Sequence, residues 1–267
     1  MSRLYDAHNH LQDPRFPKDA AALIAEASAQ GVVRMVVNGT CESDWEKVLA
    51  LARQFPEVLP SFGCHPWHLA ETNADWESRL MNYLDKLPSA IGEIGLDRWK
   101  YESTISTQIE VFSRSMRLAA ERNLPVSIHC LEAWGCLHDL LRSLPLPRRG
   151  FLLHSYGGPR EMVKPLAKLG AYFSFPGYFA HDRKARHRVT FLDVPKERLL
   201  IETDAPDQLP PQELQSFPLR DPIKGDVLNH PANLKGIYLY ASQMLGLELG
   251  ELERLVERNF LALFQGL

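Results

Sequence analysis

Histidine and carboxylate side chains capable of binding a divalent cation lie at or near the ends of several short apolar runs in this sequence. The candidate ligands are His8, His10, Glu93, His129, His154 and Asp204. Imidazole nitrogens and carboxylate oxygens, without thiolates, suit Zn²⁺, Mn²⁺ or Mg²⁺. Such a set is large enough to hold two ions about 3.5–4 Å apart with a shared carboxylate. We therefore predict divalent metal cations as cofactors, two per chain.

The first apolar run carries the most closely spaced candidates. Because side chains alternate along a strand, Asp6, His8 and His10 would share one face. His8 and His10 could then chelate one cation, whereas Asp6 is expected to orient a histidine and not to bind the metal itself. A lone histidine at a strand end is more often hydrogen-bonded than a ligand, so the prediction rests on the whole set.

Two carboxylates are the candidate catalytic residues. Glu93 stands within the apolar run 90–96, where a buried carboxylate is costly unless it is paired or metal-bound. A bound cation can lower the pKa of water toward about 7, and Asp204 would accept the proton as general base. An N-cap in the turn after the strand is the alternative role for Asp204. The implied chemistry is hydrolysis at phosphorus or at a carbonyl carbon.

Eight runs rich in β-branched and aromatic residues are predicted to be strands. They are Leu4–His8, Val32–Val37, Val58–Gly63, Ala90–Gly95, Pro125–His129, Phe151–His154, Ala171–Phe175 and Leu199–Glu202. Most are followed by a helical pattern, which implies right-handed βαβ units and a parallel sheet. We predict an α/β fold, a (β/α)₈ TIM barrel of the metallo-dependent hydrolase type, with residues 1–267 as one domain. The candidate ligands should then meet at one mouth, because all C-terminal strand ends face the same side.

Helical spacing of apolar residues predicts most of the connections. The predicted helices are Lys18–Gln30, Ser43–Gln54, Thr104–Arg122, Glu132–Arg142, Glu161–Leu169, Ala232–Leu245 and Leu249–Phe264. The stretch between Pro176 and Pro195 is expected to hold a short helix. Its basic part, 181–188, is expected to be a solvated face, with contact to an anionic substrate as the alternative. The Pro-rich stretch 206–231 is expected to be a long loop that helps to shape the pocket.

Composition excludes several protein classes. The formal net charge of −3 gives no support to a chain built to coat nucleic acid, although a local basic patch or a bound metal can hold a phosphate. The four cysteines form no CxxC pair, which favours reduced thiols and a cytoplasmic location, with Cys64 and Cys130 packed in the core. We recognise no signal peptide or membrane-spanning run, and we infer no stable protein partner.

Six short motifs resemble those of one known family over nearly the whole chain. They are Asp6-Ala-His8-Asn-His10, Gly63-Cys-His65-Pro66, Gly92-Glu93-Ile-Gly95-Leu-Asp97, Pro125-Val-Ser-Ile-His129, His154-Ser-Tyr-Gly157 and Glu202-Thr-Asp204-Ala-Pro206. Their types and order are similar to those of TatD-type hydrolases, which are metal-dependent deoxyribonucleases and relatives in the amidohydrolase superfamily.

The resemblance implies roles for individual residues. One metal would be held by His8, His10, Glu93 and Asp204, and the second by Glu93, His129 and His154. His65 resembles a residue near the scissile phosphate, and Tyr156 lies in a motif that implies contact with the substrate. The implied reaction is hydrolysis of a phosphodiester, typically in DNA.

Two positions depart from the family pattern. Leu131 stands where family members often carry an arginine, and Lys224-Gly225-Asp226 stands where an Arg-Gly-Lys cluster is common. Both missing cations are natural phosphate partners. Hydrolysis of another small phosphoester, a lactone or an amide is therefore the alternative function. A non-catalytic metal-binding barrel is a third possibility, and the choice between exonuclease and endonuclease action stays open.

Overall fold

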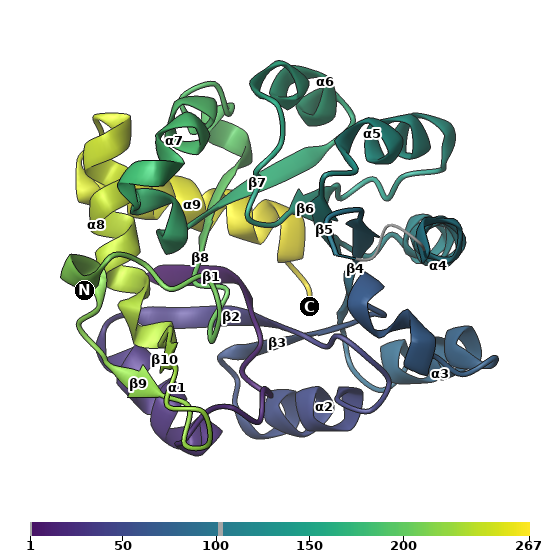
Figure 1. Ribbon diagram of the computed structural model, residues 1–267, viewed down its shortest axis with the longest axis horizontal. Coiled ribbons are helices and arrows are strands. Elements are labelled where there is room, and N and C mark those ends of the chain that lie inside the picture. The colour runs from purple at the N-terminus through teal and green to yellow at the C-terminus, as the bar shows by residue number, and fades with distance from the viewer. Residues whose placement is uncertain (1, 101–103) are drawn as a thin grey trace.

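Eight parallel strands form one sheet in this computed structural model, which describes residues 2–100 and 104–267. The strands are β1 (Leu4–Asn9), β2 (Val32–Asn38), β3 (Val58–Phe62), β4 (Ala90–Asp97), β5 (Val126–Leu131), β6 (Phe151–Leu153), β7 (Ala171–Pro176) and β8 (Leu199–Glu202). Each strand pairs with the next in the chain, and Figure 1 shows them as a ring surrounded by helices. The predicted (β/α)₈ barrel is confirmed, and every predicted strand is present.

The helices cover the outside of this ring. They are α1 (Ala20–Ala29), α2 (Trp45–Gln54), α3 (Trp76–Leu84), α4 (Ile105–Arg122), α5 (Trp134–Ser143), α6 (Val163–Lys168), α7 (Ala185–Phe191), α8 (Leu234–Leu245) and α9 (Leu249–Phe264). None of them, within the described ranges, is long and apolar enough to cross a lipid bilayer.

Two connections differ from the prediction. Helix α3 is absent from the predicted set, although its buried residues Trp76, Leu80 and Leu84 recur every four positions and place one face on the barrel. The predicted helix 161–169 is divided, because a 3₁₀ turn (Arg160–Met162) precedes α6. Neither difference moves a candidate ligand, since both lie in connections on the outside of the sheet.

Hydrogen bonds between β1 and the segment that follows β8 close the barrel. The backbone N–H of Asp204 donates to the carbonyl of His8 at 2.9 Å. The buried Asp6 carboxylate accepts the Thr203 N–H at 2.9 Å and the Thr203 hydroxyl at 2.6 Å. Asp6 also accepts the backbone N–H of His8 at 3.3 Å, and among the described residues it forms no hydrogen bond with a histidine ring. The expectation that Asp6 orients a histidine side chain is therefore corrected: Asp6 joins β1 to the segment that follows β8.

The last two helices complete the fold. Figure 1 shows α9 crossing behind the ring, and α9 contacts β1 and β8. The Asn259 side-chain amide of α9 donates to the carbonyls of Lys196 and Leu199, at 2.7 and 2.8 Å. In α8, the buried Tyr238 hydroxyl binds both the N–H and the carbonyl of Tyr5. Helix α9 thus covers the end of the barrel opposite the C-terminal ends of the strands. Side chains of α8 and α9 hold both helices in place by hydrogen bonds to backbone groups of the barrel.

The long segment after β8 is more ordered than expected. Strands β9 (Leu219–Arg220) and β10 (Val227–Leu228) pair as a short antiparallel ribbon inside the predicted loop 206–231. Beyond it, the buried His230 ring accepts the Ala232 N–H at Nδ1, so its Nε2–H donates to Glu26 of α1 at 2.8 Å. This contact fixes the end of the segment to the outer layer of helices.

Neutral His230 should make the stability of the protein sensitive to acid. Burial lowers the pKa of His230 to about 4 from an ordinary value of 6.5, although Glu26 opposes the shift. Between pH 6.5 and pH 4 the unfolded chain therefore takes up the proton first, and stability is lost as the pH falls through this window. We expect urea unfolding to lose about 2 kcal/mol from this residue between pH 7 and pH 5.

The His230→Asn variant is the control, because asparagine can still cap the following turn but does not titrate. An equal loss of stability in wild type and variant over that pH range would contradict the assignment.

Candidate metal centre

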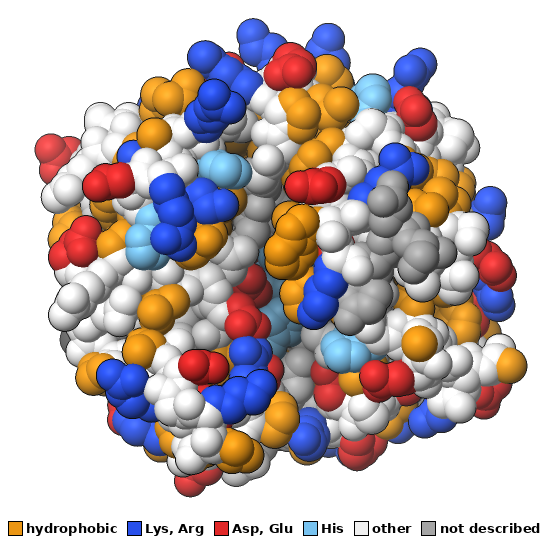
Figure 2. Space-filling view, in the orientation of Figure 1, with side chains coloured by type: hydrophobic (Ala, Val, Ile, Leu, Met, Phe, Trp, Pro, Cys, Tyr) orange, Lys and Arg blue, Asp and Glu red, His pale blue; other side chains and the backbone are white. Residues whose placement is uncertain are grey.

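The predicted ligands converge where the C-terminal ends of the strands meet. His8, Glu93 and His129 lie in β1, β4 and β5, whereas His10, His154 and Asp204 follow β1, β6 and β8. Figure 2 shows a hollow in the middle of this face, with histidine and acidic side chains at its bottom. All six are buried except His10, whose side chain is 12% exposed. The structure therefore brings the whole predicted set together in a place largely withheld from water.

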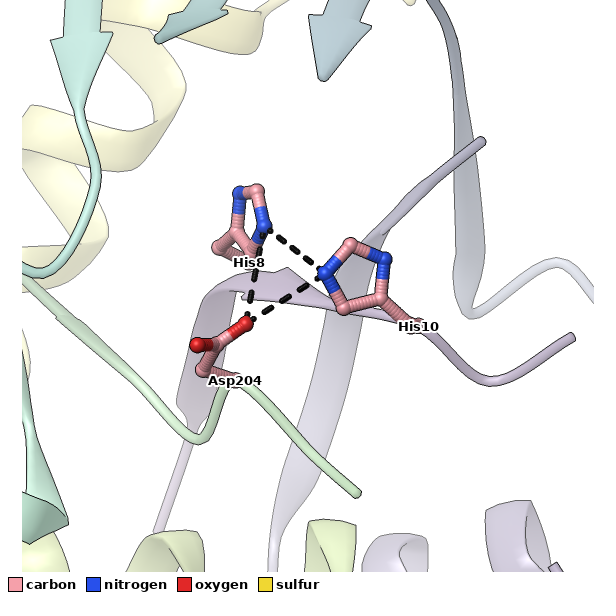
Figure 3. Close-up of side chains that lie close together, drawn as sticks. All are labelled: His8, His10 and Asp204. Atoms are coloured by element: carbon pink, nitrogen blue, oxygen red, sulfur yellow. Dashed lines mark hydrogen bonds and ion pairs between the residues drawn. The ribbon is translucent and has the colours of Figure 1, made fainter. Parts of the chain in front are cut away.

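A first set of donors lies between β1 and the segment after β8, as Figure 3 shows. The Nε2 atoms of His8 and His10 are 3.3 Å apart. They lie 3.4 and 3.3 Å from Glu93 Oε2, and 3.7 and 3.4 Å from Asp204 Oδ1. The Asp204 side chain faces the two histidines and caps no helix in the described ranges, so its alternative role as an N-cap does not apply.

A second set surrounds the other oxygen of the same carboxylate. Glu93 Oε1 lies 2.8 Å from His154 Nε2 and 3.2 Å from His129 Nδ1. These two nitrogens are 3.4 Å apart. The His8 and His154 rings stack with centroids 4.0 Å apart, so the two sets are neighbours. Glu93 is therefore placed to be shared between them.

The spacing of the donors fits a tetrahedral metal ion. Ligand atoms about 2.1 Å from an ion in tetrahedral geometry are separated from one another by roughly 3.4 Å. The distances in the first set are 3.3 to 3.7 Å, and most of those in the second set are 3.2 to 3.4 Å. Two unprotonated ring nitrogens facing each other at this distance cannot form a hydrogen bond, but they can bind one cation. The donor set therefore fits divalent metal ions.

The outer ring nitrogens of His8 and His10 are held by polar groups of the barrel. His10 Nδ1–H donates to the carbonyl of Asn38 at 2.8 Å. Since that carbonyl can only accept, the proton of neutral His10 lies on Nδ1 and the lone pair of Nε2 faces Glu93 and Asp204. His8 Nδ1 lies 2.7 Å from the buried hydroxyl of Ser127. These contacts fix both the orientation of the rings and the nitrogen that is available to a cation.

The rings of the second set have carboxylate neighbours that the sequence prediction did not assign to the site. Asp97 Oδ2 accepts from Trp67 Nε1 at 2.6 Å and from His129 Nε2 at 3.2 Å, which leaves His129 Nδ1 facing Glu93. Glu202 is fully buried, and its Oε1 lies 3.8 Å from His154 Nδ1. Glu202 stands at the end of an apolar run and begins the motif Glu202-Thr-Asp204-Ala-Pro206, so the sequence marked its position but not its contact with His154.

Electrostatics in this cluster are dominated by the buried carboxylates. Burial by itself raises the pKa of Glu93, but His65, His154 and His8 together outweigh burial and hold that pKa well below its ordinary value. Burial lowers the pKa of His154, yet Glu93 and Glu202 raise it well above its ordinary value. The buried carboxylates therefore require positive charge close by. Divalent cations bound in the cluster would supply that charge.

His65 enters the site as a hydrogen-bond donor. Its Nδ1 accepts the Trp67 N–H at 3.1 Å, so the proton of the neutral ring lies on Nε2. That Nε2 is 3.3 Å from Glu93 Oε1, and burial lowers the pKa of His65 to about 4, so the ring is neutral at pH 7. His65 lies close enough to Glu93 and His129 to be considered a third ligand, but a protonated Nε2 cannot bind a metal. The predicted position of His65 beside the substrate therefore stays a prediction.

Tyr156 does not reach the cluster. Its side chain is fully buried between Trp134 and Phe173, with ring centroids 4.7 and 5.0 Å away. Its hydroxyl donates to the carbonyl of Pro159 at 2.8 Å. The predicted contact with substrate is therefore replaced by a packing role, because the hydroxyl is used inside the loop that follows β6.

Replacing Tyr156 with phenylalanine should separate these two roles. The variant keeps the ring but removes the donor to the Pro159 carbonyl, so we expect a loss of about 1 kcal/mol in the free energy of unfolding. Metal-dependent kcat/KM should stay at the wild-type value. A large fall in kcat/KM with unchanged stability would instead indicate that Tyr156 contacts the substrate.

Comparison with known proteins agrees with this geometry. The family described as "TatD related DNase" matches residues 5–265. The chain is 31% identical over 266 residues to the 3'-5' ssDNA/RNA exonuclease TatD of Enterobacter lignolyticus, and 31% identical over 264 residues to that of Escherichia fergusonii, with 98% of each chain covered in both cases. The crystal structure of a TatD homologue from Escherichia coli K12 superposes with a TM-score of 0.88 at 25% identity, covering 98% of both chains. The chain therefore belongs to the TatD-related DNase family of metal-dependent hydrolases.

Proposed function

We propose that this chain is a metal-dependent nuclease that removes nucleotides from the 3' end of single-stranded DNA or RNA. The observation that carries the proposal is the buried Glu93 carboxylate, which offers one oxygen to each of two sets of donors. A pair of ions sharing a carboxylate is suited to phosphodiester hydrolysis, because it can stabilise both the attacking and the leaving oxygen. Two relatives, each 31% identical to this chain, are 3'-5' exonucleases of single-stranded DNA and RNA. They support the choice of substrate and the direction of degradation.

The proposed ligands divide into two sites. His8, His10, Glu93 and Asp204 would hold one ion, and Glu93, His129 and His154 would hold the other. Four imidazoles among the donors favour Zn²⁺ over Mg²⁺, which prefers an all-oxygen shell. Bound cations would supply Lewis acidity and would lower the pKa of a water molecule toward about 7.

Two residues of the chain would take distinct roles in the hydrolysis. One carboxylate oxygen of Asp204 faces His8 and His10, while the other points away from them in Figure 3 and can accept a proton from the attacking water. The Nε2–H of His65 faces Glu93 Oε1 at 3.3 Å and could donate to a phosphate oxygen bound beside that carboxylate. Both side chains are buried, so water is largely excluded around the proton transfer.

A second candidate function is hydrolysis of a small phosphoester, lactone or amide at the same centre. Leu131 favours it, because this side chain at the end of β5 is 36% exposed and presents an apolar surface two residues beyond His129. An apolar side chain there offers no charge to a phosphate. The two candidates differ in the length and charge of the preferred substrate.

Glu93→Gln tests the shared carboxylate. The amide is nearly isosteric but neutral and a poorer ligand, so we expect metal content after dialysis to fall from two ions per chain to at most one. Elemental analysis and titration calorimetry measure this directly. Glu121→Gln, on the exposed face of α4, is the matched control and should keep wild-type metal content. Two tightly held ions in a folded Glu93→Gln protein would show that Glu93 does not bridge.

The nuclease proposal is tested with linear and circular single-stranded DNA. We expect stepwise shortening of a 5'-labelled linear strand in the presence of divalent metal, and no cleavage of the circle, which has no ends. Asp204→Asn should lower kcat by about 10²- to 10⁴-fold. Cleavage of the circle would indicate an endonuclease. Inactivity on all nucleic acids with turnover of p-nitrophenyl esters would favour the second candidate.

A further inference from the structure

A basic segment lies on the rim of the hollow, between two loops that carry site residues. Residues 177–188 follow β7 and comprise two 3₁₀ turns and the first part of α7. The His181 ring lies 3.1 Å from the carbonyl of Leu209, in the segment after Asp204. On the other side, the His187 ring lies near Gly157, three residues after His154, where a β-carbon on Gly157 would come within 3.5 Å of His187 Nε2. The segment therefore lies between the loop after β6 and the segment after β8, on the face where the strands end.

Two cations of this segment are gathered on one aromatic ring. The Arg183 guanidinium carbon lies 5.1 Å from the centroid of Tyr178, and Arg183 also donates to the Tyr178 hydroxyl at 3.0 Å. Lys184 Nζ lies 4.8 Å from the same centroid. Cation–π contacts of this kind orient a charge without neutralising it. Tyr178 thus fixes two positive charges close together at the rim.

Neither cation is paired with a carboxylate among the described residues, although Asp182 is adjacent in the chain. By contrast, Arg15, Arg114 and Arg160 all form ion pairs with aspartate or glutamate. Arg188 of the same segment is engaged differently, since it donates to the backbone carbonyls of Phe179 and His181 and so holds the turn together. Arg183 and Lys184 are therefore available to an external anion.

Charge complementarity identifies the class of that anion. In Figure 2, lysine and arginine side chains gather beside the hollow, on the side where Figure 1 places α7. Two adjacent cations repel each other, and a phosphate between them would relieve that repulsion. The chain as a whole carries a net charge of −3, so attraction of a polyanion has to come from a local patch such as this one.

We propose that Arg183 and Lys184, positioned by Tyr178, bind a backbone phosphate of the substrate strand away from the bond that is cleaved. This inference rests on the proposed nuclease function and adds a second point of attachment for the strand. The contact is with phosphate and not with a base, so it would act on DNA and RNA of any sequence. It would favour long strands over short phosphodiesters.

The double variant Arg183→Ala/Lys184→Ala tests the contact. For a single-stranded 20-mer we expect KM to rise by about tenfold or more with kcat unchanged. The slope of log kcat/KM against log salt concentration should become shallower by about 0.7, since one phosphate contact on a single strand is lost. Turnover of bis(p-nitrophenyl) phosphate, which is too short to reach the rim, should match the wild type.

The control is Lys47→Ala/Arg53→Ala on the exposed face of α2, which removes the same charge from the outside of the barrel. It should leave the KM and the salt dependence unchanged. Tyr178→Leu should raise the KM for the 20-mer, and Tyr178→Phe, which keeps the ring, should largely retain the wild-type value.

The outcomes separate this inference from the nuclease proposal. Failure of the wild-type protein to shorten any strand overturns the proposed function itself. Normal nuclease activity with an unchanged KM and salt slope in the Arg183/Lys184 variant overturns only the rim contact. Equal losses on the 20-mer and on bis(p-nitrophenyl) phosphate would also overturn it, because the defect would then lie in the metal centre. Inhibition by inorganic phosphate as strong as by an oligonucleotide of equal phosphate content would identify an isolated anion site and contradict strand binding.

Discussion

The Glu93 carboxylate is 2% exposed and surrounded by imidazoles, so the groups around it must compensate its negative charge. A carboxylate withheld from water is stable only when positive charge or hydrogen-bond donors replace the lost solvation. Here the two oxygens face different ring nitrogens, so the compensation is divided between two places. The same division makes Glu93 suitable as a bridge between two cations.

Closure of the barrel and assembly of the site depend on the same few contacts. The Asp204 N–H binds the His8 carbonyl, and Asp6 binds the backbone of Thr203 just before Asp204. These bonds join the first strand to the segment after the last one, and they bring Asp204 to the two histidines of β1. A mutation that weakened this seam would therefore affect folding and metal binding together.

The rim and the bottom of the hollow have different chemistry. At the bottom, ring orientations are fixed by Asn38, Ser127 and Asp97, so the donors are rigid and little affected by solvent. At the rim, Arg183 and Lys184 are held against the Tyr178 side chain, and Leu131 presents an apolar surface. The bottom would determine which bond can be hydrolysed, and the rim would determine which molecules bring that bond to it.

The sequence alone was sufficient for the barrel, for the family and for the convergence of the six candidate ligands. Strand alternation and strand-end position are local properties, so the spacing of His8 and His10, and the position of Glu93 in an apolar run, could be interpreted without a structure. Helix α3 was equally local, and its four-residue spacing could have been recognised.

Other features required the tertiary structure. The packing of Tyr156 against Trp134 and Phe173, the partner of Asp6 and the approach of Glu202 to His154 are each decided by groups from other segments of the chain. The proton position on His65 is set locally, by the N–H of Trp67 two residues further on. Periodicity indicates the face on which a side chain lies, but hydrogen-bond partners and burial depend on neighbours brought together only by barrel closure. For that reason the sequence determined which residues are candidate metal ligands, and the fold determined which of the surrounding residues orient them and which only pack.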